Sequence, residues 1–163
     1  MVVSHMRIDD RLIHGQIVTA WIKDSGANVI LVADDAAAKD ATQKMLLQLA
    51  TPKHVKLLVE SITNAGKILA DNTLGDNVLV IVRNPKTAFD LFETGFKIDT
   101  LNVGNISNSK SITGRKRLLP FIYLEEQDFQ NLKKIADLGI RLDIRSVPTD
   151  HSIDGLDFIT KNY

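Results

Sequence analysis

The sequence has no cysteine, no excess of charge of either sign and no long apolar run. The absence of cysteine excludes a disulfide framework and a thiolate metal site. The 20 Lys and Arg residues balance 20 Asp and Glu residues. This balance argues against a general nucleic-acid binder, because such proteins carry a strong positive bias. The densest apolar cluster, Val78 to Val82, is far shorter than the roughly 18 residues that a membrane-spanning helix needs.

The start of the sequence has no basic segment followed by a long apolar one, so we expect no secretory signal and a cytoplasmic protein. The chain has 163 residues, of which 44% are hydrophobic and 25% charged, values typical of globular proteins. It shows no repeat, low-complexity tract or linker. A single domain over residues 1–163 is therefore predicted.

Short apolar runs alternate with helical patterns along the chain. Strands are predicted at apolar, β-branched runs, namely around Ser4–Met6 and over Val29–Ala33, Val55–Val59, Val78–Val82, Leu101–Val103 and Arg141–Val147. Helices are predicted where apolar residues recur at helical spacing, namely Ile17, Ala20 and Trp21, then Ala38, Ala41, Met45 and Leu49, then Ile62, Ala65 and Leu69, and finally Phe129, Leu132 and Ala136.

One further helix has both of its ends marked in the sequence. Asn84 can cap its start, Pro85 suits its first position, and Gly95 suits the residue just beyond its end. A short terminal helix is expected in the tail from His151 onward. Pro120 interrupts the apolar run Leu118 to Leu124, so we place that strand at an edge of the sheet.

This order of elements predicts an α/β fold, with a doubly wound, mostly parallel central sheet, helices on both faces and an antiparallel edge strand. Ligands of such sheets bind beyond the carboxyl ends of the strands. Polar clusters follow four of the predicted strands, at Asp9–Gln16, Asp34–Asp35, Arg83–Asn84 and Asn102–Asn105. We expect these clusters to share one rim of the domain and to form a site.

His14 lies where the first predicted strand gives way to a helix. The first N–H groups of a helix, here at Gly15 and Gln16, have no partner within the helix and attract anions, phosphate above all. Arg11 lies in the same loop, and its guanidinium can bind phosphate oxygens with two donors. A neutral imidazole is a good nucleophile near pH 7. These residues predict a phosphate-binding rim with a candidate histidine nucleophile and no need of a metal.

The residues alone leave two points open. Either Asp9 or Asp10 can orient the imidazole, and either can instead hold Arg11. A lone histidine in a loop is also commonly a structural hydrogen bonder. The other histidines carry weaker signals: we expect His5 to be structural, His54 to lie in a solvated turn and His151 to lie in the tail.

The segment around His14 closely resembles the active-site loop of the enzyme IIB components of the mannose/fructose/sorbose family of the bacterial phosphoenolpyruvate-dependent sugar phosphotransferase system (PTS). The resemblance rests first on the stretch Arg7-Ile8-Asp9-Asp10-Arg11-Leu12-Ile13-His14-Gly15-Gln16-Ile17. It continues, in order, through Trp21, Val32-Ala33-Asp34-Asp35, Val82-Arg83-Asn84-Pro85, Leu101-Asn102-Val103-Gly104-Asn105 and Arg145-Ser146-Val147-Pro148. It therefore covers nearly the whole chain.

The resemblance implies a phosphocarrier. A IIA partner would donate a phosphoryl group from its own phosphohistidine to His14, on the ring nitrogen nearer the backbone. The group would then pass to a sugar carried by the membrane partners IIC and IID, with the protein transiently at the inner face of the membrane. Arg11 matches the family's phosphate-clamping arginine. The resemblance implies no cofactor, and it leaves mannose, fructose, sorbose and N-acetylgalactosamine all open as the sugar.

The remaining rim residues are expected to support this site. Gly15 and Gln16 would bind the phosphate with their backbone, and the supporting residues would be Asp9, Asp10, Asp34, Arg83 and Asn105. The family often has Lys where Arg83 stands, which keeps the charge and changes its geometry. The loop after Asn105, Ile106-Ser107-Asn108-Ser109-Lys110-Ser111, also departs from the family pattern.

Two other classes of protein are alternatives. A signalling receiver module would use Asp34 and Asp35 as an acidic pair for Mg²⁺. Against it, the pair follows the second predicted strand instead of the first, and the next strand ends in Glu60-Ser61 where a phospho-acceptor Asp is wanted. A mononucleotide-binding protein would need a glycine-rich loop, and only Gly15 lies in the turn after the first strand.

Overall fold

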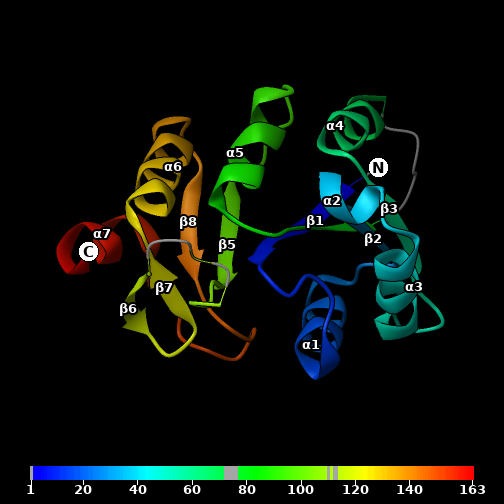
Figure 1. Ribbon diagram of the computed structural model, residues 1–163, viewed down its shortest axis with the longest axis horizontal. Helices are drawn as coiled ribbons and strands as arrows, with labels where there is room; N and C mark the ends of the chain where they lie inside the picture. The colour runs from blue at the N-terminus through cyan, green and yellow to red at the C-terminus, as the bar shows by residue number, and fades with distance from the viewer. Residues whose placement is uncertain (1, 72–76, 110, 112–113) are drawn as a thin grey trace.

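The computed structural model describes residues 2–71, 77–109, 111 and 114–163, with the side chains of Val2, Gln16 and Ile17 left out (Figure 1). Its main sheet has the order β3-β2-β4-β1-β5-β8-β9. The strands are β1 (Val2–Asp9), β2 (Val29–Ala33), β3 (Lys56–Glu60), β4 (Asn77–Val82), β5 (Thr100–Asn105), β8 (Arg141–Ile144) and β9 (Ile153–Asp154). All neighbours pair in parallel except β8 and β9, which are antiparallel.

Helices lie on both faces of the sheet, as the sequence predicts (Figure 1). They are α1 (Gly15–Ser25), α2 (Asp35–Ala38), α3 (Ala41–Ala50), α4 (Ile62–Asp71), α5 (Pro85–Glu93), α6 (Glu126–Asp137) and α7 (Gly155–Asn162). Each face has its own hydrophobic core: α4, α5, α6 and α7 pack on one side, and α1, α2 and α3 pack on the other. The predicted doubly wound fold with a mostly parallel sheet is confirmed.

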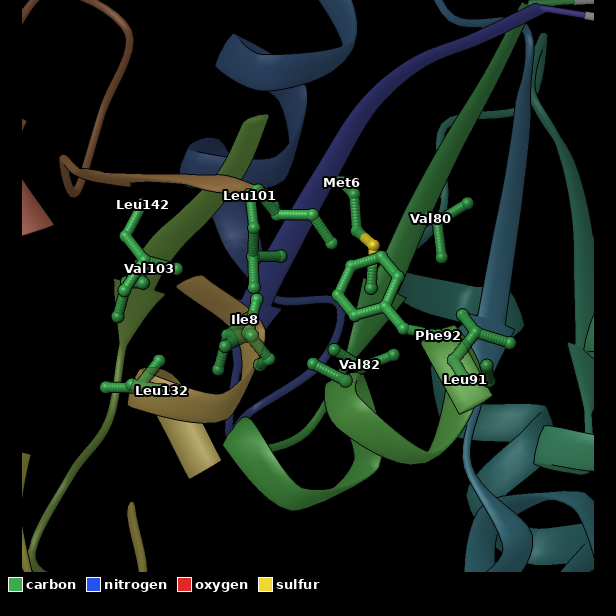
Figure 2. Close-up of a cluster of buried hydrophobic side chains, with 14 of the residues drawn as sticks. Met6, Ile8, Val80, Val82, Leu91, Phe92, Leu101, Val103, Leu132 and Leu142 are labelled. Atoms are coloured by element: carbon green, nitrogen blue, oxygen red, sulfur yellow. The ribbon is translucent and has the colours of Figure 1, made fainter. Parts of the chain in front are cut away.

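The apolar strands β2 and β4 supply both cores. Along β2, Val29, Leu31 and Ala33 face the first core, while Ile30 and Val32 face the second. Strand β4 alternates in the same way. Figure 2 shows Leu91 and Phe92 of α5 beside Met6 of β1 and Val80 and Val82 of β4 in the first core. Continuous apolar runs therefore mark the strands that are buried on both faces.

The predicted caps of helix α5 are also confirmed. The side chain of Asn84 accepts a hydrogen bond from the amide of Thr87 at 2.9 Å, and Pro85 is the first helical residue. Gly95 has a φ of 103°, the left-handed conformation that suits glycine just beyond a helix end.

The edge strand predicted over Leu118 to Leu124 is wrong. The structure forms a separate antiparallel hairpin there, of β6 (Lys116–Leu119) and β7 (Ile122–Leu124), with Pro120 in its turn. Proline fits a turn because it fixes φ and lacks the N–H that a strand pairs. The antiparallel edge of the main sheet is instead β9.

The single helix predicted from Ala38 to Leu49 is also wrong. Helix α2 ends at Ala38, with Lys39 as its C-cap, and Asp40 then caps α3, because its carboxylate accepts from the amide of Gln43 at 3.1 Å. The expected inner face is not buried: Met45 and Leu49 are 57% and 76% exposed, and Leu47 is the buried residue of α3. Of the inner face predicted for helix α1, Trp21 is buried and Ala20 is partly buried, while the side chain of Ile17 lies outside the described part of the chain. Val18 and Ile22 of the same helix are also buried.

Candidate active site

The rim predicted from the strand ends is present in the structure. Strand β1 lies between β4 and β5, so the loop after Asp9 meets the residues that follow both neighbours. Arg83, after β4, donates from Nη1 to the carbonyl of Asp10 at 3.3 Å. Asn105, at the end of β5, donates from Nδ2 to Oδ1 of Asp9 at 3.2 Å. Asp34, after β2, pairs with Arg83.

His14 is bonded to Asp9. Its Nε2 lies 2.8 Å from Oδ2 of Asp9, and its side chain is 13% exposed while that of Asp9 is fully buried. Asp9 also accepts from the backbone amide of Arg11 at 3.0 Å and from the guanidinium of Arg7. Asp9, and not Asp10, is therefore the residue that orients the imidazole.

The charge state of Asp9 follows from these donors. Burial acts to raise the pKa of Asp9, but the hydrogen bond from His14 and the charge of Arg7 outweigh it, so the pKa lies below its ordinary value. An ionised carboxylate only accepts hydrogen bonds, so Nε2 of His14 carries the proton in this bond. In the neutral form of the ring, the other nitrogen, Nδ1, then keeps its lone pair, which is the form in which an imidazole acts as a nucleophile.

The backbone of the loop fixes the direction of His14. Leu12 takes up a left-handed conformation with a φ of 59°, and its amide bonds to the carbonyl of Asp9 at 2.9 Å. Leu12 and Ile13 are buried, which anchors the loop to the core beneath α1. Gly15 has a φ of 48°, a conformation in which other residues are strained. The turn into α1 therefore needs both a buried anchor and a glycine.

His14 is the N-cap of helix α1, but its side chain makes no capping hydrogen bond. The first amides of the helix, at Gly15 and Gln16, are thus available to an anion at the side of the imidazole. Arg11 is exposed, and within the described part of the chain its guanidinium has no hydrogen-bond or ion-pair partner. The arrangement places an imidazole, a helix N-terminus and an arginine without a partner in one short loop of the described chain.

The other predicted rim residues hold loops together. Arg83 binds the carboxylate of Asp34 through Nε and Nη2, at 3.2 and 3.3 Å, and Asp34 in turn caps α2 at the amide of Ala37. Asp10 accepts from the amide and the hydroxyl of Ser107, at 2.8 and 2.6 Å. These contacts join the loops after β1, β2, β4 and β5 into one rigid rim.

The remaining histidines lie outside the loop around His14. His54 and His151 are exposed, as expected. The ring of His5 stacks on that of Trp21 with their centroids 4.2 Å apart, in keeping with a structural role. Burial, followed by the charge of Arg7, lowers the pKa of His5 to about 4, so its ring is neutral near pH 7.

The chain resembles proteins of one known family. It matches the family described as "PTS system sorbose subfamily IIB component" over residues 3–163. It is 33% identical to the sorbose-specific EIIB component of Klebsiella pneumoniae over 162 residues, which cover 99% of this chain and 97% of the relative. It is also 33% identical over 162 residues to the mannose-specific EIIAB component of Escherichia coli K12, of which it covers 49%.

The same likeness holds in three dimensions. The crystal structure of the IIBSor domain of the sorbose permease from Klebsiella pneumoniae superposes with a TM-score of 0.92 and 32% identity, covering 100% of this chain and 99% of that one. These matches do not favour the receiver alternative, and both oxygens of Asp34 are already engaged by Arg83.

Among the described residues, no helix is long and apolar enough to cross a bilayer.

Proposed function

Since the chain belongs to the sorbose subfamily of IIB components, the sugar phosphotransferase components of the PTS, we propose that it carries a phosphoryl group on Nδ1 of His14. The observation that supports this proposal most directly is the hydrogen bond between Nε2 of His14 and Oδ2 of Asp9, 2.8 Å long. It occupies the outer ring nitrogen and leaves the one nearer the backbone as the nucleophile.

The transfer needs no proton to move. Nδ1 attacks the phosphorus atom of the donor's phosphohistidine, a bond forms between Nδ1 and phosphorus, and the donor's nitrogen–phosphorus bond breaks. The donor ring leaves as a neutral imidazole, and the proton on Nε2 of His14 stays in its hydrogen bond to Asp9. Passing the group onward to a sugar hydroxyl forms the phosphate ester and returns His14 to its starting state, with the hydroxyl proton released.

The loop around His14 offers donors for the oxygens of the phosphoryl group. The amides at the start of α1, at Gly15 and Gln16, and the guanidinium of Arg11 stabilise the negative charge on its oxygens during transfer. Phosphoryl transfer depends chiefly on such positioning and charge stabilisation. Asp10, Asp34, Arg83 and Asn105 support the site by holding the loops around it.

The proposed partners are a IIA protein that donates from its phosphohistidine and the membrane components IIC and IID that carry the sugar. A matched relative is a mannose-specific EIIAB component, of which this chain covers about half. The protein would act on the cytoplasmic side and meet the inner face of the membrane only during transfer. Relatives are named for sorbose and mannose, so the sugar is a matter for experiment.

The test is to phosphorylate the chain with phosphoenolpyruvate and a reconstituted relay that ends in IIA, and to map the group by mass spectrometry under non-acidic conditions. We expect label on His14, with NMR of the ¹⁵N-labelled ring placing it on Nδ1. The His14→Ala variant should stay folded and take up no phosphate. The exposed histidines provide matched controls, and His54→Ala and His151→Ala should label normally. Label on any other side chain would overturn the proposal.

A further inference from the structure

Arg7 is a fully buried charged residue on the central strand of the sheet. It lies two residues before Asp9, so both side chains point to the same face of β1, the face that α1 covers. Its Nε and Nη2 donate to Oδ2 of Asp9, at 3.2 and 3.1 Å. That same oxygen binds Nε2 of His14. Burying a guanidinium is costly unless it is paired, and here its pair is the carboxylate that orients the nucleophile.

The strands beside β1 hold Arg7 in place. Its Nη1 donates to Oδ1 of Asn102 on β5 at 2.8 Å and to the carbonyl of Arg145 at 3.3 Å. Asn102 is itself fixed, because its Nδ2 donates to the carbonyls of Asp143 and Arg145, both at 3.1 Å. The guanidinium carbon also lies 5.6 Å from the ring centroid of Trp21. Arg7 is thus fixed on several sides and cannot turn away from Asp9.

Gly104 provides the space for this arrangement. A Cβ atom added there would lie 2.0 Å from Nη1 of Arg7, well inside any possible contact distance. Gly104 has no left-handed backbone angle, so close approach is the reason for glycine at this position. Two residues of β5 therefore accommodate Arg7: Asn102 accepts its hydrogen bond, and Gly104 leaves space for its guanidinium.

The position of Arg7 bears on the protonation of His14. A lone carboxylate beside an imidazole favours the imidazolium form, in which both ring nitrogens carry protons and neither is a nucleophile. A positive charge on the same carboxylate oxygen offsets this effect. The carboxylate can then orient the ring without increasing its affinity for a second proton.

We propose that Arg7 is a positioning residue for phosphoryl transfer, which aims Oδ2 of Asp9 at Nε2 of His14 and offsets its charge, so that Nδ1 keeps its lone pair. This inference rests on the proposed role of His14. Arg7 touches neither the phosphoryl group nor its donor, and it acts through Asp9.

The other charged groups near the pair do not replace Arg7. Arg145 is paired with Asp143 at 2.8 Å, and Arg83 with Asp34. Asp10, next to Asp9, is bonded to Ser107. Two groups remain: Arg11 is exposed, and His5 is neutral near pH 7 because burial lowers its pKa. Arg7 is consequently the cation bonded to Asp9 within the described part of the chain.

The first test is NMR of the His14 ring in the unphosphorylated protein, with ¹⁵N-labelled histidine. In the wild type we expect the neutral form protonated at Nε2. In Arg7→Met the imidazolium form should appear, and with it the acid limb of the transfer rate against pH should begin, at higher pH than in the wild type. Arg7→Lys keeps the positive charge, so its pH profile should lie close to that of the wild type. Its transfer should still be slow, because lysine lacks the planar guanidinium that donates two hydrogen bonds to Asp9.

Gly104→Ala tests the same inference without removing the arginine. We expect it to displace Arg7, to slow transfer by about tenfold or more, and to have little added effect in the Arg7→Met background. Arg115→Met is the matched control, because Arg115 forms another buried pair, with Asp128 at 2.8 Å. It should lower the thermal midpoint and leave the His14 ring and the pH profile unchanged.

The results separate the two proposals. If folded Arg7→Met or Gly104→Ala kept the wild-type ring form and pH profile, or if Arg115→Met shifted them equally, Arg7 would be merely structural. Because the NMR measurement uses unphosphorylated protein, it can support the role of Arg7 even if phosphate were mapped elsewhere. Such mapping would instead overturn the proposed function. Should Arg7→Met fail to fold, Arg7→Lys and Gly104→Ala decide the question.

Discussion

His14 and Asp9 form a hydrogen bond 2.8 Å long between Nε2 and Oδ2, at the carboxyl end of the central strand β1. The bond joins a half-buried ring in a loop to a carboxylate that is fully buried in the sheet. It fixes which ring nitrogen faces inward, and it does so from the central strand of the sheet. The chemistry proposed for the loop thus depends on residues that lie beneath it.

Replacing Asp9 by Asn should slow transfer from phospho-IIA by about a hundredfold or more, because an amide does not select the Nε2-protonated ring. It should also lower the free energy of unfolding by about 3–5 kcal/mol, since Arg7 is left buried without a counter-charge. Rapid-quench kinetics and urea unfolding measure the two effects. Asp34→Asn is the control: it breaks the pair with Arg83 away from the ring and should slow transfer far less. Equal rates in the two variants would contradict the role of Asp9.

Replacing Arg11 by Ala should raise the barrier to transfer by about 2–4 kcal/mol, as expected for removal of one charged donor from a developing phosphoryl charge. The free energy of unfolding should change by less than about 0.5 kcal/mol, because the side chain is exposed. Lys39, an exposed cation next to helix α2, provides the control variant Lys39→Ala. A wild-type rate in Arg11→Ala would make Arg11 a bystander.

Alanine at Gly15 and at Gly26 should separate stability from transfer. Both glycines have positive φ, 48° and 69°, and an added Cβ would meet nothing within 4 Å at either site. Each variant should therefore lose about 1–2 kcal/mol of unfolding free energy from backbone strain alone. Only Gly15→Ala, which lies beside His14, should also slow transfer. If Gly26→Ala slowed it equally, the effect would come from stability.

Replacing His5 by Phe should make the fold less sensitive to mild acid. The pKa of His5 is lowered to about 4 in the folded protein, against about 6.5 in an unfolded chain. Between these values the unfolded chain binds a proton that the folded one does not. The contribution to stability is full above about pH 6.5 and is lost as the pH falls toward about 4.

From about pH 7 to about pH 5, the wild type should therefore lose about 2 kcal/mol more unfolding free energy than His5→Phe, measured by urea titration. Phenylalanine keeps an aromatic ring to stack on Trp21 and removes the titratable nitrogens, so the two proteins are compared by how their stability changes with pH. His54→Phe, at an exposed position, should lose as much unfolding free energy over this pH range as the wild type. If the unfolding free energies of His5→Phe and the wild type changed in parallel with pH, His5 would take up a proton as readily in the folded protein as in the unfolded chain.

The sequence predicted the fold well where each element carries its own signal. Strand β2 is apolar at every position, β4 is apolar from Val78 to Val82, and helix α5 has explicit caps. The prediction failed where packing against the rest of the fold decides which face of a helix is buried. The apolar residues Met45 and Leu49 of helix α3 are exposed, and Leu47 is buried instead.

The candidate site was predicted in part. Because His14, Asp9 and Arg83 all lie at or just after strand ends, the sequence predicted that they share one rim. It could not separate the two adjacent aspartates, and only the structure shows that Asp9 binds the His14 ring and Asp10 binds Ser107. Arg7 was missed because a charged residue in a strand suggests an exposed face. The alternation of Arg7 with Asp9, and of Asn102 with Gly104, was the available signal that these side chains share one face.

The central place of β1 has a consequence for how the chain is made. Strand β1 and the His14 loop leave the ribosome before β4 and β5, the strands that flank β1 in the sheet. Until Asn102, Gly104 and Asn105 have been added, the nascent chain lacks some of the residues that surround Arg7 and some of the donors to Asp9. The native shape of the His14 loop therefore depends on residues that are translated well after it.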